Sequence, residues 1–406
     1  MWEENLDDIA EKDAVEDDVF HLKPDFVLDD DDSDTDQPLD TKYECWRKEF
    51  NAELISLSVH PAFPEVAHVA VGSCDDTCTI VDLSSQDGWF CPSCFRMRSG
   101  GSDAQQTLLG PFEETVSCCA YSPDGAYLSL GCMDGSFLVY SISNSKYDHL
   151  CTVNGPADGI EWVSWLGDSS AVMFGGSGHT VYIWNPQLQT TACVTTTDTN
   201  SCGKFCMYGD NALAVLGGDD GHLNIVRYSN GSVGSVSDVP LGSDSVTCVD
   251  CHDTVQLAVA GLFDGSLYFV GLSKKSISAS FLEDHTDTVE SVKFCSGASS
   301  TMAVSCGHDG RVITWDCERM TKLNVVSLSA KLTRMVWVPS VFVVAVSNVR
   351  GELYTLKNGK VIKHNRPHKK VVLDLVTMPC DDDEWALLSV SEDGAMVICR
   401  EMFSED

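Results

Sequence analysis

The chain has 406 residues, of which 43% are apolar and 21% are charged, so it is long and apolar enough to bury a substantial core. Its formal net charge is −35, and such a surface repels nucleic acid and anionic membranes while it attracts basic partners. No run of eighteen apolar residues occurs and no basic region precedes an apolar one at the N-terminus, so we expect neither a transmembrane helix nor a secretion signal.

Cysteine usage indicates a reducing compartment. The nineteen cysteines are scattered through strand-like stretches, and Cys119, Cys206 and Cys251 occupy apolar positions, where a thiol behaves as a small hydrophobe. A short secreted module would instead carry an even framework of paired cysteines. We therefore expect a cytoplasmic protein that could also occur in the nucleus.

Residues 1–41 form a strongly acidic segment. They hold 17 acids and 2 bases, so the rest of the chain still carries 44 acids against 24 bases. Self-repulsion and sparse apolar residues predict a disordered tail. Two functions stay open for it: a tail that only solvates the protein, and an arm that contacts a basic partner, with Phe20 and Phe26 as apolar contact points.

From residue 42 onwards the chain repeats. Each unit has a first strand rich in Val and Leu, a small apolar second strand, an Asp/Gly turn and a third strand. When the turns are aligned on Gly310, the same site is occupied by Asp76, Gly135, His179, Gly221, Gly265, Gly351 and Gly394. The successive intervals are 59, 44, 42, 44, 45, 41 and 43 residues, and the longest contains an insertion at about 84–106. This period predicts an all-β propeller over residues 42–406 with eight blades, or seven if the weak first unit pairs differently.

The most complete repeat runs from Asp284 to Asp316. Its residues His285, Ser305, Asp309 and Trp315 stand where a WD repeat places a hydrogen-bonded His/Ser/Asp/Trp set, so we predict a WD-repeat propeller and assign these four a structural role. The eighth unit ends with its third strand at Arg400, which would leave an unpaired edge. We expect the strand-like residues 42–49 to supply the missing outer strand and close the ring.

Three other features suggest chemistry only weakly. Cys91 and Cys94 form a C-x-x-C in the insertion, but Cys74 and Cys78 lie on a strand and turn upstream, so we expect a loop rather than a zinc site. The basic cluster at 360–370 could touch RNA or an acidic partner, and we favour a solvated connection between blades. No catalytic or phosphate-binding motif occurs, so we predict a non-enzyme without cofactor or metal.

Acidic residues are predicted to gather on one face of the propeller. In this fold the turns between second and third strands emerge on the same side as the loops that enter the first strands. The acids placed there are Asp75, Asp76, Asp134, Asp219, Asp220, Asp264, Glu392 and Asp393 from the turns, with Glu114, Asp158 and Asp287 from the loop entries. Many turn aspartates serve the turn itself, but their convergence at one mouth predicts a protein-binding surface.

Two first strands also carry an acid at their second position. Glu161 and Glu290 occupy this site, whereas Thr247 and Thr333 occupy it in two other units, so the strand itself does not require a carboxylate. Trp162 follows Glu161, and an aromatic ring beside a carboxylate is a good receptor for Arg or Lys. The alternative for Trp162 is packing between blades two and three.

These residues resemble one WD-repeat family. Gly159 to Trp165 reads GIEWVSW and is similar to the acidic-Trp strand of the third repeat in the angio-associated migratory cell protein family, which includes a fungal chaperone of a newly made ribosomal protein. Val289 to Cys295 reads VESVKFC and is similar to the opening of its sixth repeat. The resemblance covers 110–400 in register and 42–83 more loosely. His179 in place of the turn glycine and the added insertion depart from it, as does a seventh repeat without its turn Asp and its Trp.

The resemblance implies an eight-bladed propeller that holds the basic N-terminal segment of a large-subunit ribosomal protein on an acidic face until that protein joins the 60S subunit. We expect a monomer that spans no membrane, binds no nucleic acid directly and uses Glu161, Trp162, Glu290 and the surrounding acids as its client groove. The alternative is a signalling scaffold in cell migration or angiogenesis, with several peptide ligands on separate faces.

Overall fold

The computed structural model describes residues 38–84, 104–156, 158–208, 211–295, 301–338, 342–380 and 385–403. Most of the acidic tail, and the insertion with Cys91 and Cys94, fall outside these residues. The described part consists of strands joined by turns and loops. It contains no helix long and apolar enough to cross a membrane.

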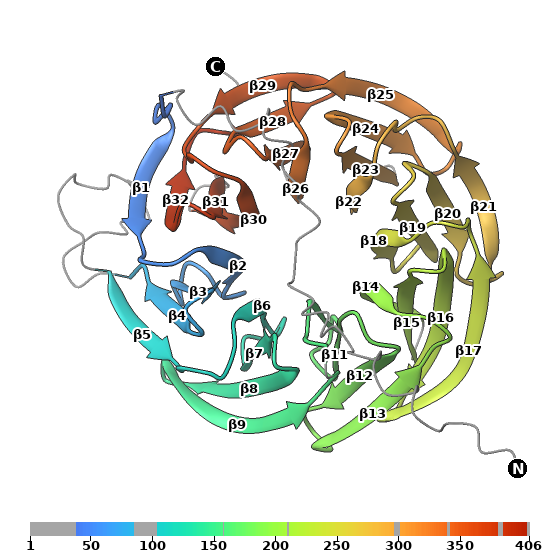
Figure 1. The fold of residues 1–406 in the computed structure, drawn as a ribbon, viewed down its shortest axis with the longest axis horizontal. Helices are drawn as coiled ribbons and strands as arrows, with labels where there is room; N and C mark the ends of the chain where they lie inside the picture. Colours follow the sequence, from blue (N-terminus) through green and yellow to red (C-terminus); the bar gives the residue numbers. More distant parts are fainter. Residues whose placement is uncertain are drawn as a thin grey trace, which may run out of the picture.

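The described strands form eight four-stranded antiparallel sheets arranged as the blades of a ring (Figure 1). Blade one contains β2 (Leu54–Val59), β3 (His68–Ser73), β4 (Cys78–Asp82) and β5 (Gln105–Leu109). Blade two contains β6 (Val116–Tyr121), β7 (Tyr127–Cys132), β8 (Ser136–Ser143) and β9 (Lys146–Asn154). Blade three contains β10 (Trp162–Trp165), β11 (Val172–Gly175), β12 (Thr180–Asn185) and β13 (Thr190–Thr195). Blade four contains β14 (Asn200–Tyr208), β15 (Asn211–Gly218), β16 (His222–Ser229) and β17 (Ser232–Pro240).

The second half of the ring repeats this order. Blade five contains β18 (Val246–His252), β19 (Leu257–Leu262), β20 (Leu267–Gly271) and β21 (Ser276–Phe281). Blade six contains β22 (Val289–Cys295), β23 (Met302–Gly307), β24 (Arg311–Asp316) and β25 (Thr321–Ser327). Blade seven contains β26 (Leu332–Val338), β27 (Val343–Asn348), β28 (Leu353–Lys357) and β29 (Lys360–Asn365). Blade eight contains β30 (Val372–Pro379), β31 (Trp385–Ser391), β32 (Ala395–Cys399) and β1 (Glu44–Glu49). The prediction of an eight-bladed propeller is therefore confirmed.

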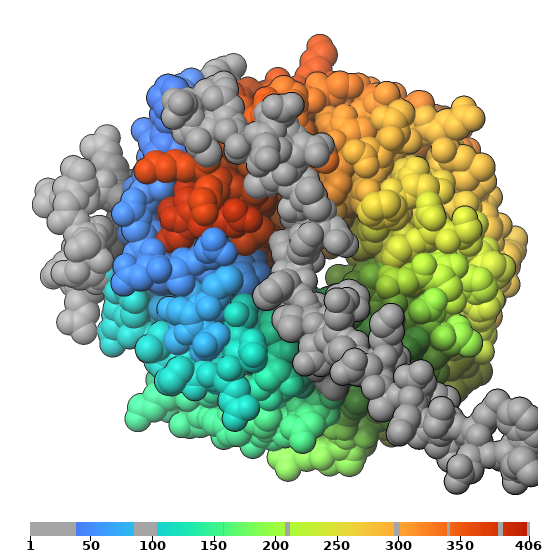
Figure 2. Space-filling model, viewed as in Figure 1, coloured from blue at the N-terminus to red at the C-terminus, as the bar shows by residue number. Residues whose placement is uncertain are grey.

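The two ends of the chain meet in blade eight. Its strand order is β1-β32-β31-β30, so the first strand of the chain is the outermost strand of the last blade. Glu49 lies opposite Ala395, and the Arg400 N–H donates to the Tyr43 carbonyl at 2.9 Å. In Figure 2 the blue start of the described chain accordingly lies against its red end. Pairing of β1 covers an edge of β32 that would otherwise expose unpaired backbone groups.

Apolar packing between neighbouring blades forms the core. The second strands β3, β19 and β27 are buried along their whole length, whereas the outer strand β25 is mostly exposed. One cluster packs Val215 and Leu223 of blade four against Val246 of blade five. Each such side chain contributes about 1.5–3 kcal/mol when it leaves water. This packing, which recurs between blades, therefore holds the ring where the His/Ser/Asp/Trp set is incomplete.

The turns between second and third strands share a face with the loops that enter the next blade, and we call it the entry face. The turn residue aligned with Gly310 accepts, through its carbonyl, an N–H from the loop that leads to the next blade. This bond occurs at Asp76, Gly135, His179, Gly221, Gly310, Gly351 and Gly394. At Gly310 φ is 72°, and a Cβ would lie 2.6 Å from the Leu328 carbonyl, which explains the glycine. The sequence alignment of the turns therefore matches their positions in space.

Candidate functional site

The His/Ser/Asp/Trp set of blade six is a continuous hydrogen-bonded chain. His285 lies 3.1 Å from the Asp309 carboxylate and 2.8 Å from the Ser305 hydroxyl, and the Trp315 indole N–H donates to Ser305 at 2.9 Å. Burial alone would raise the pKa of Asp309, but the hydrogen bond and charge of His285 lower it. The set ties the loop that enters blade six to the turn of the same blade. These four residues are buried and offer no exposed binding surface.

A second, incomplete set lies in blade eight and corrects two predictions. His368 is fully buried, 2.8 Å from the Ser389 hydroxyl and 3.2 Å from Asp393, while Cys399 fills the tryptophan position. Asp393 therefore serves the fold rather than an exposed groove. The basic cluster at 360–370 is only in part a solvated connection, because Lys360–Asn365 forms β29 and Lys363 and His368 are buried, whereas Lys369 and Lys370 are exposed. The spacing could have identified this set, because His368 lies 25 residues before Asp393 and His285 lies 24 residues before Asp309.

Several turn acids use their carboxylate oxygens to hold their own turn. Asp134 accepts from the Ser136 N–H at 2.7 Å, Asp264 from the Ser266 N–H at 2.8 Å, and Asp75 from the Thr77 hydroxyl at 2.6 Å. Asp220 likewise accepts from the His222 N–H, and Asp76 adopts a left-handed φ of 62° at the turn. These roles explain why Asp is so frequent at these sites. Their charge still faces water, because Asp75 and Asp264 are exposed.

Other predicted acids lie exposed on the entry face over a wide arc. Glu114 precedes blade two and Asp158 precedes blade three, and neither makes a hydrogen bond or ion pair with a described residue. Asp219 accepts from the Ser245 and Thr199 hydroxyls in blade four. Together with Asp264 and Asp287, these side chains form what we call the acidic arc, which runs across blades two to six. Its members are Glu114, Asp134, Asp158, Asp219, Asp264 and Asp287.

Trp162 is not the predicted receptor for a cation. Its indole N–H donates to the Asn200 carbonyl at 2.9 Å, and its ring lies against Gly175 and Gly203. A Cβ at Gly175 would lie only 2.6 Å from the ring, so the two glycines provide the space that the indole fills. Trp162 therefore packs between blades three and four rather than between blades two and three. Glu161 beside it accepts a hydrogen bond from Ser177.

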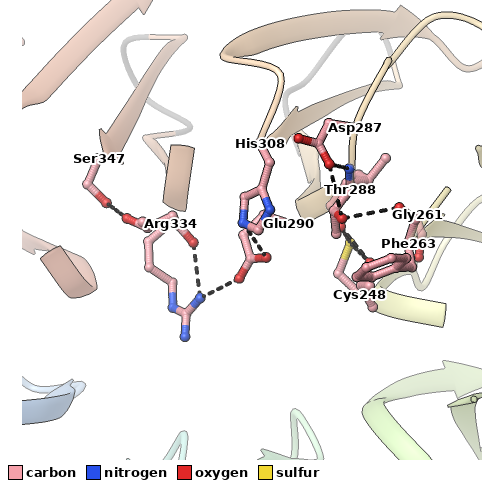
Figure 3. Close-up of polar contacts among 12 residues, drawn as sticks. Cys248, Gly261, Phe263, Asp287, Thr288, Glu290, His308, Arg334 and Ser347 are labelled. Atoms are coloured by element: carbon pink, nitrogen blue, oxygen red, sulfur yellow. Dashed lines mark hydrogen bonds and ion pairs between the residues drawn. The ribbon is translucent and has the colours of Figure 1, made fainter. Parts of the chain in front are cut away.

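Glu290 is partly neutralised by its neighbours. Figure 3 shows Arg334 and His308 pointing toward the Glu290 carboxylate from two sides. The Arg334 guanidinium lies 3.1 Å from one carboxylate oxygen, and His308 Nε2 lies 3.4 Å from the other. Arg334 comes from β26, so the sequence around Glu290 could not reveal this ion pair.

The second position of the first strand joins neighbouring blades. Hydroxyl groups there donate to a carbonyl of the next blade, from Ser117 to Ile160, from Thr247 to Val289 and from Thr333 to Val372. In most first strands a register shift, typical of a bulge, falls at this position. Glu161 and Glu290 occupy the same site in blades three and six. The site is structural where it carries a hydroxyl, a role that sequence reasoning missed.

Charges of both signs lie deeper along the first strands. Lys204 lies 3.8 Å from Asp250, and Asp250 accepts from the Phe294 N–H at 2.8 Å. Asp374 accepts from the Leu57 N–H at 2.7 Å, and burial raises the pKa of its carboxyl group. The first strands therefore carry paired or hydrogen-bonded charges of both signs.

The entry face is also polarised. Blades seven and eight contribute a set of basic residues that we call the basic sector, with Lys369 and Lys370 exposed. Its members are Lys331, Arg334, Arg350, Lys369 and Lys370. Glu392, predicted as a binding residue, lies in this sector and close enough to Glu53 and Lys370 for their charges to act on it, although burial is the main factor that raises its pKa.

Sequence reasoning overlooked Phe263, which follows β19 on the entry face. Its side chain is 55% exposed although it is large and aromatic. The turn alignment could have identified it, because Asp219 and His308 occupy the equivalent place in the neighbouring blades. Phe263 is the aromatic residue at a turn position that carries both polar and apolar side chains in the other blades.

Two segments of the chain match the model of the WD domain, G-beta repeat, at residues 103–141 and 276–316. The second contains the complete His/Ser/Asp/Trp set. The chain carries WD repeats in an eight-bladed propeller.

A WD repeat-containing protein 26 homolog from Drosophila melanogaster is 30% identical over 138 residues, which cover 32% of this chain and 22% of that protein. An echinoderm microtubule-associated protein-like 2 from Mus musculus is 26% identical over 29% of this chain and 19% of its own length. The chain thus spans about a fifth of the length of these curated relatives.

Solved structures share the whole architecture. The Chaetomium thermophilum Sqt1 bound to the N-terminus of the ribosomal protein L10 superposes with a TM-score of 0.71 at 16% identity, covering 88% of this chain and 99% of that one. The computationally designed Ika8 protein reaches a TM-score of 0.67 at 15% identity, covering 88% and 99%. A designed protein is nearly as similar as a natural one, so these likenesses establish the fold alone.

Proposed function

We propose that this protein is a non-enzymatic chaperone that binds a basic, extended protein segment along the acidic arc. The client we propose is a large-subunit ribosomal protein, held through its basic N-terminal segment until it joins the 60S subunit. The protein would keep this client soluble. The carboxylates of the acidic arc would neutralise the client's basic N-terminal segment, which would otherwise associate with nucleic acid.

The observation that carries this proposal is the acidic arc itself. Exposed carboxylates from five consecutive blades lie on one face, and Glu114 and Asp158 have no partner among the described residues. Carboxylates at loop tips reach lysine and arginine side chains through charge-assisted hydrogen bonds. The basic sector is a poorer site for the same segment, because Lys369 and Lys370 are exposed there, although Lys370 lies 3.7 Å from Glu53.

Two further facts support the choice of client. The sequence resembles the angio-associated migratory cell protein family, and the Sqt1 structure with the same architecture holds the N-terminus of the ribosomal protein L10. Glu290 is a poorer test residue than the sequence suggested, because Arg334 and His308 already contact it. Residues without a structural role test the surface more cleanly.

The test reverses two exposed charges and measures binding by calorimetry. We expect Glu114→Lys with Asp158→Lys to weaken the affinity of the full chain for a synthetic basic N-terminal segment of the client by about 1–3 kcal/mol. The loss should shrink as salt is added, because exposed charges are screened. A matched control reverses Glu65 and Glu318, which are exposed on the opposite face and change the net charge equally. Equal affinity for the arc variant and the control would contradict the proposal.

Affinity purification of the full chain with mass spectrometry distinguishes the alternative function. A ribosome-assembly chaperone should retain a large-subunit ribosomal protein at low salt. Recovery of membrane or cytoskeletal regulators without any ribosomal protein would instead support the signalling scaffold.

A further inference from the structure

The side chain of Phe263 is exposed on a turn that holds its backbone in place. Its N–H donates to the Ser245 carbonyl at 2.9 Å, and its own carbonyl accepts from the Thr288 hydroxyl at 3.1 Å. The next residue, Asp264, holds the turn by accepting from the Ser266 N–H at 2.8 Å. The exposure of the ring is therefore not a consequence of a loose loop.

The fold does not need an aromatic residue at this site. The equivalent place in the other seven blades is taken by residues that differ in size and polarity, namely Cys74, Met133, Ser177, Asp219, His308, Val349 and Glu392. Isolated apolar side chains are common on protein surfaces and need no explanation. Phe263 differs from these because the two residues that bind its backbone also bind carboxylates.

One carboxylate lies on each side of the turn. Asp219 of blade four accepts from the Ser245 hydroxyl, and Ser245 is the residue that holds the Phe263 N–H. On the other side, Asp287 accepts from the Thr288 N–H at 2.8 Å, and Thr288 holds the Phe263 carbonyl. Figure 3 shows Phe263, Thr288 and Asp287 together at this edge of the entry face. Short chains of hydrogen bonds thus link the backbone of Phe263, whose side chain is exposed, to one carboxylate from each neighbouring blade.

We propose that Phe263, with Asp219 and Asp287, is a subsite that binds an arginine side chain of the client. A planar guanidinium stacks on an aromatic face while its N–H groups donate to carboxylates, and a lysine ammonium does so less well. This subsite takes the role that the sequence suggested for Trp162. It rests on the proposed function, because a basic segment on the acidic arc would bring an arginine to blade five.

The test measures how full-length protein binds a tetra-arginine peptide and a tetra-lysine peptide at low salt. We expect the wild type to prefer arginine, and Phe263→Ala to weaken tetra-arginine binding about two- to thirty-fold, the range of a cation–π contact. The same variant should bind tetra-lysine almost unchanged, so that the preference disappears. Val255→Ala is the matched control, since it removes an exposed apolar side chain from the opposite face of the same blade.

Each outcome decides between the two proposals. If Phe263→Ala matches the wild type, or weakens both peptides equally, the arginine subsite is wrong while the acidic arc stands. If the wild type binds neither peptide at low salt, the proposed function fails together with the subsite. Near-ultraviolet circular dichroism of Phe263→Ala checks that the fold is retained.

Discussion

The hydroxyl of Ser305 serves two buried groups that have few other partners. The His285 ring and the Trp315 indole both bind it, at 2.8 and 2.9 Å. A buried polar group that loses its partner costs more than the hydrogen bond itself is worth. The residues of this set therefore stabilise the fold because each satisfies a buried hydrogen-bonding group of another. Each residue can be replaced singly to test this.

We predict that Ser305→Ala lowers the free energy of unfolding by about 1–3 kcal/mol per group left without a partner. The measurement is a denaturant titration followed by tryptophan fluorescence. Ser327→Ala, on an exposed site of the same blade, serves as the control and should change little. A Ser305→Ala midpoint equal to that of the control would show that the hydrogen-bonded set carries no stability.

Acid pH should weaken the equivalent contact in blade eight. Burial opposes ionisation of Asp393, but its hydrogen bond with His368 lowers the pKa to about 2. A depressed carboxyl pKa gives stability that is present above the ordinary value near 4 and is lost as the pH falls toward 2. We expect Asp393→Asn to be less stable at pH 7 and to lose less stability between pH 4 and pH 2. Parallel pH profiles for the two proteins, from denaturant midpoints, would contradict this.

At the scale of the element, β1 decides whether the ring is closed. It contributes the outer strand of blade eight, and Leu54 and Val390 pack in one cluster across the joint between blades one and eight. A strand taken from the start of the chain thus holds the end of the chain. β32 pairs with β31 on one side, and on its other side β1 is its strand partner.

We predict that a chain starting at residue 52 exposes the edge of β32, melts at a lower temperature and associates in solution. A chain starting at residue 38 keeps β1 and is the matched control, expected to stay folded and monodisperse. Light scattering and thermal denaturation check both. Identical melting of the two truncated chains would rule out a closing role for β1.

At the scale of the whole molecule, charge is separated across the entry face. The acidic arc covers blades two to six, while Lys369 and Lys370 of the basic sector are exposed beside blade eight. A field of this kind orients an approaching basic segment as well as attracting it. The repeats are similar in backbone, so this asymmetry comes from the side chains at the loop tips alone.

The repeat period determined the fold from sequence, because every blade needs the same turn and the same buried strands. The alignment on Gly310 therefore found the eight turns and the face on which they lie. It also placed the acidic residues on this face, because the order of the strands determines the side of the ring on which each turn lies. His368 was missed because the basic residues around it suggested exposure, although its spacing to Asp393 carried the signal.

Tertiary structure decided which of these side chains remain available. Trp162 fills a space between two glycines, and Glu290 is neutralised by Arg334, which lies 44 residues further along the chain. Contacts between blades depend on which residues face one another across the joint, and a period cannot specify them. Phe263 is the converse case, because the sequence shows an aromatic residue in a strand-like run and only the folded turn leaves its side chain exposed.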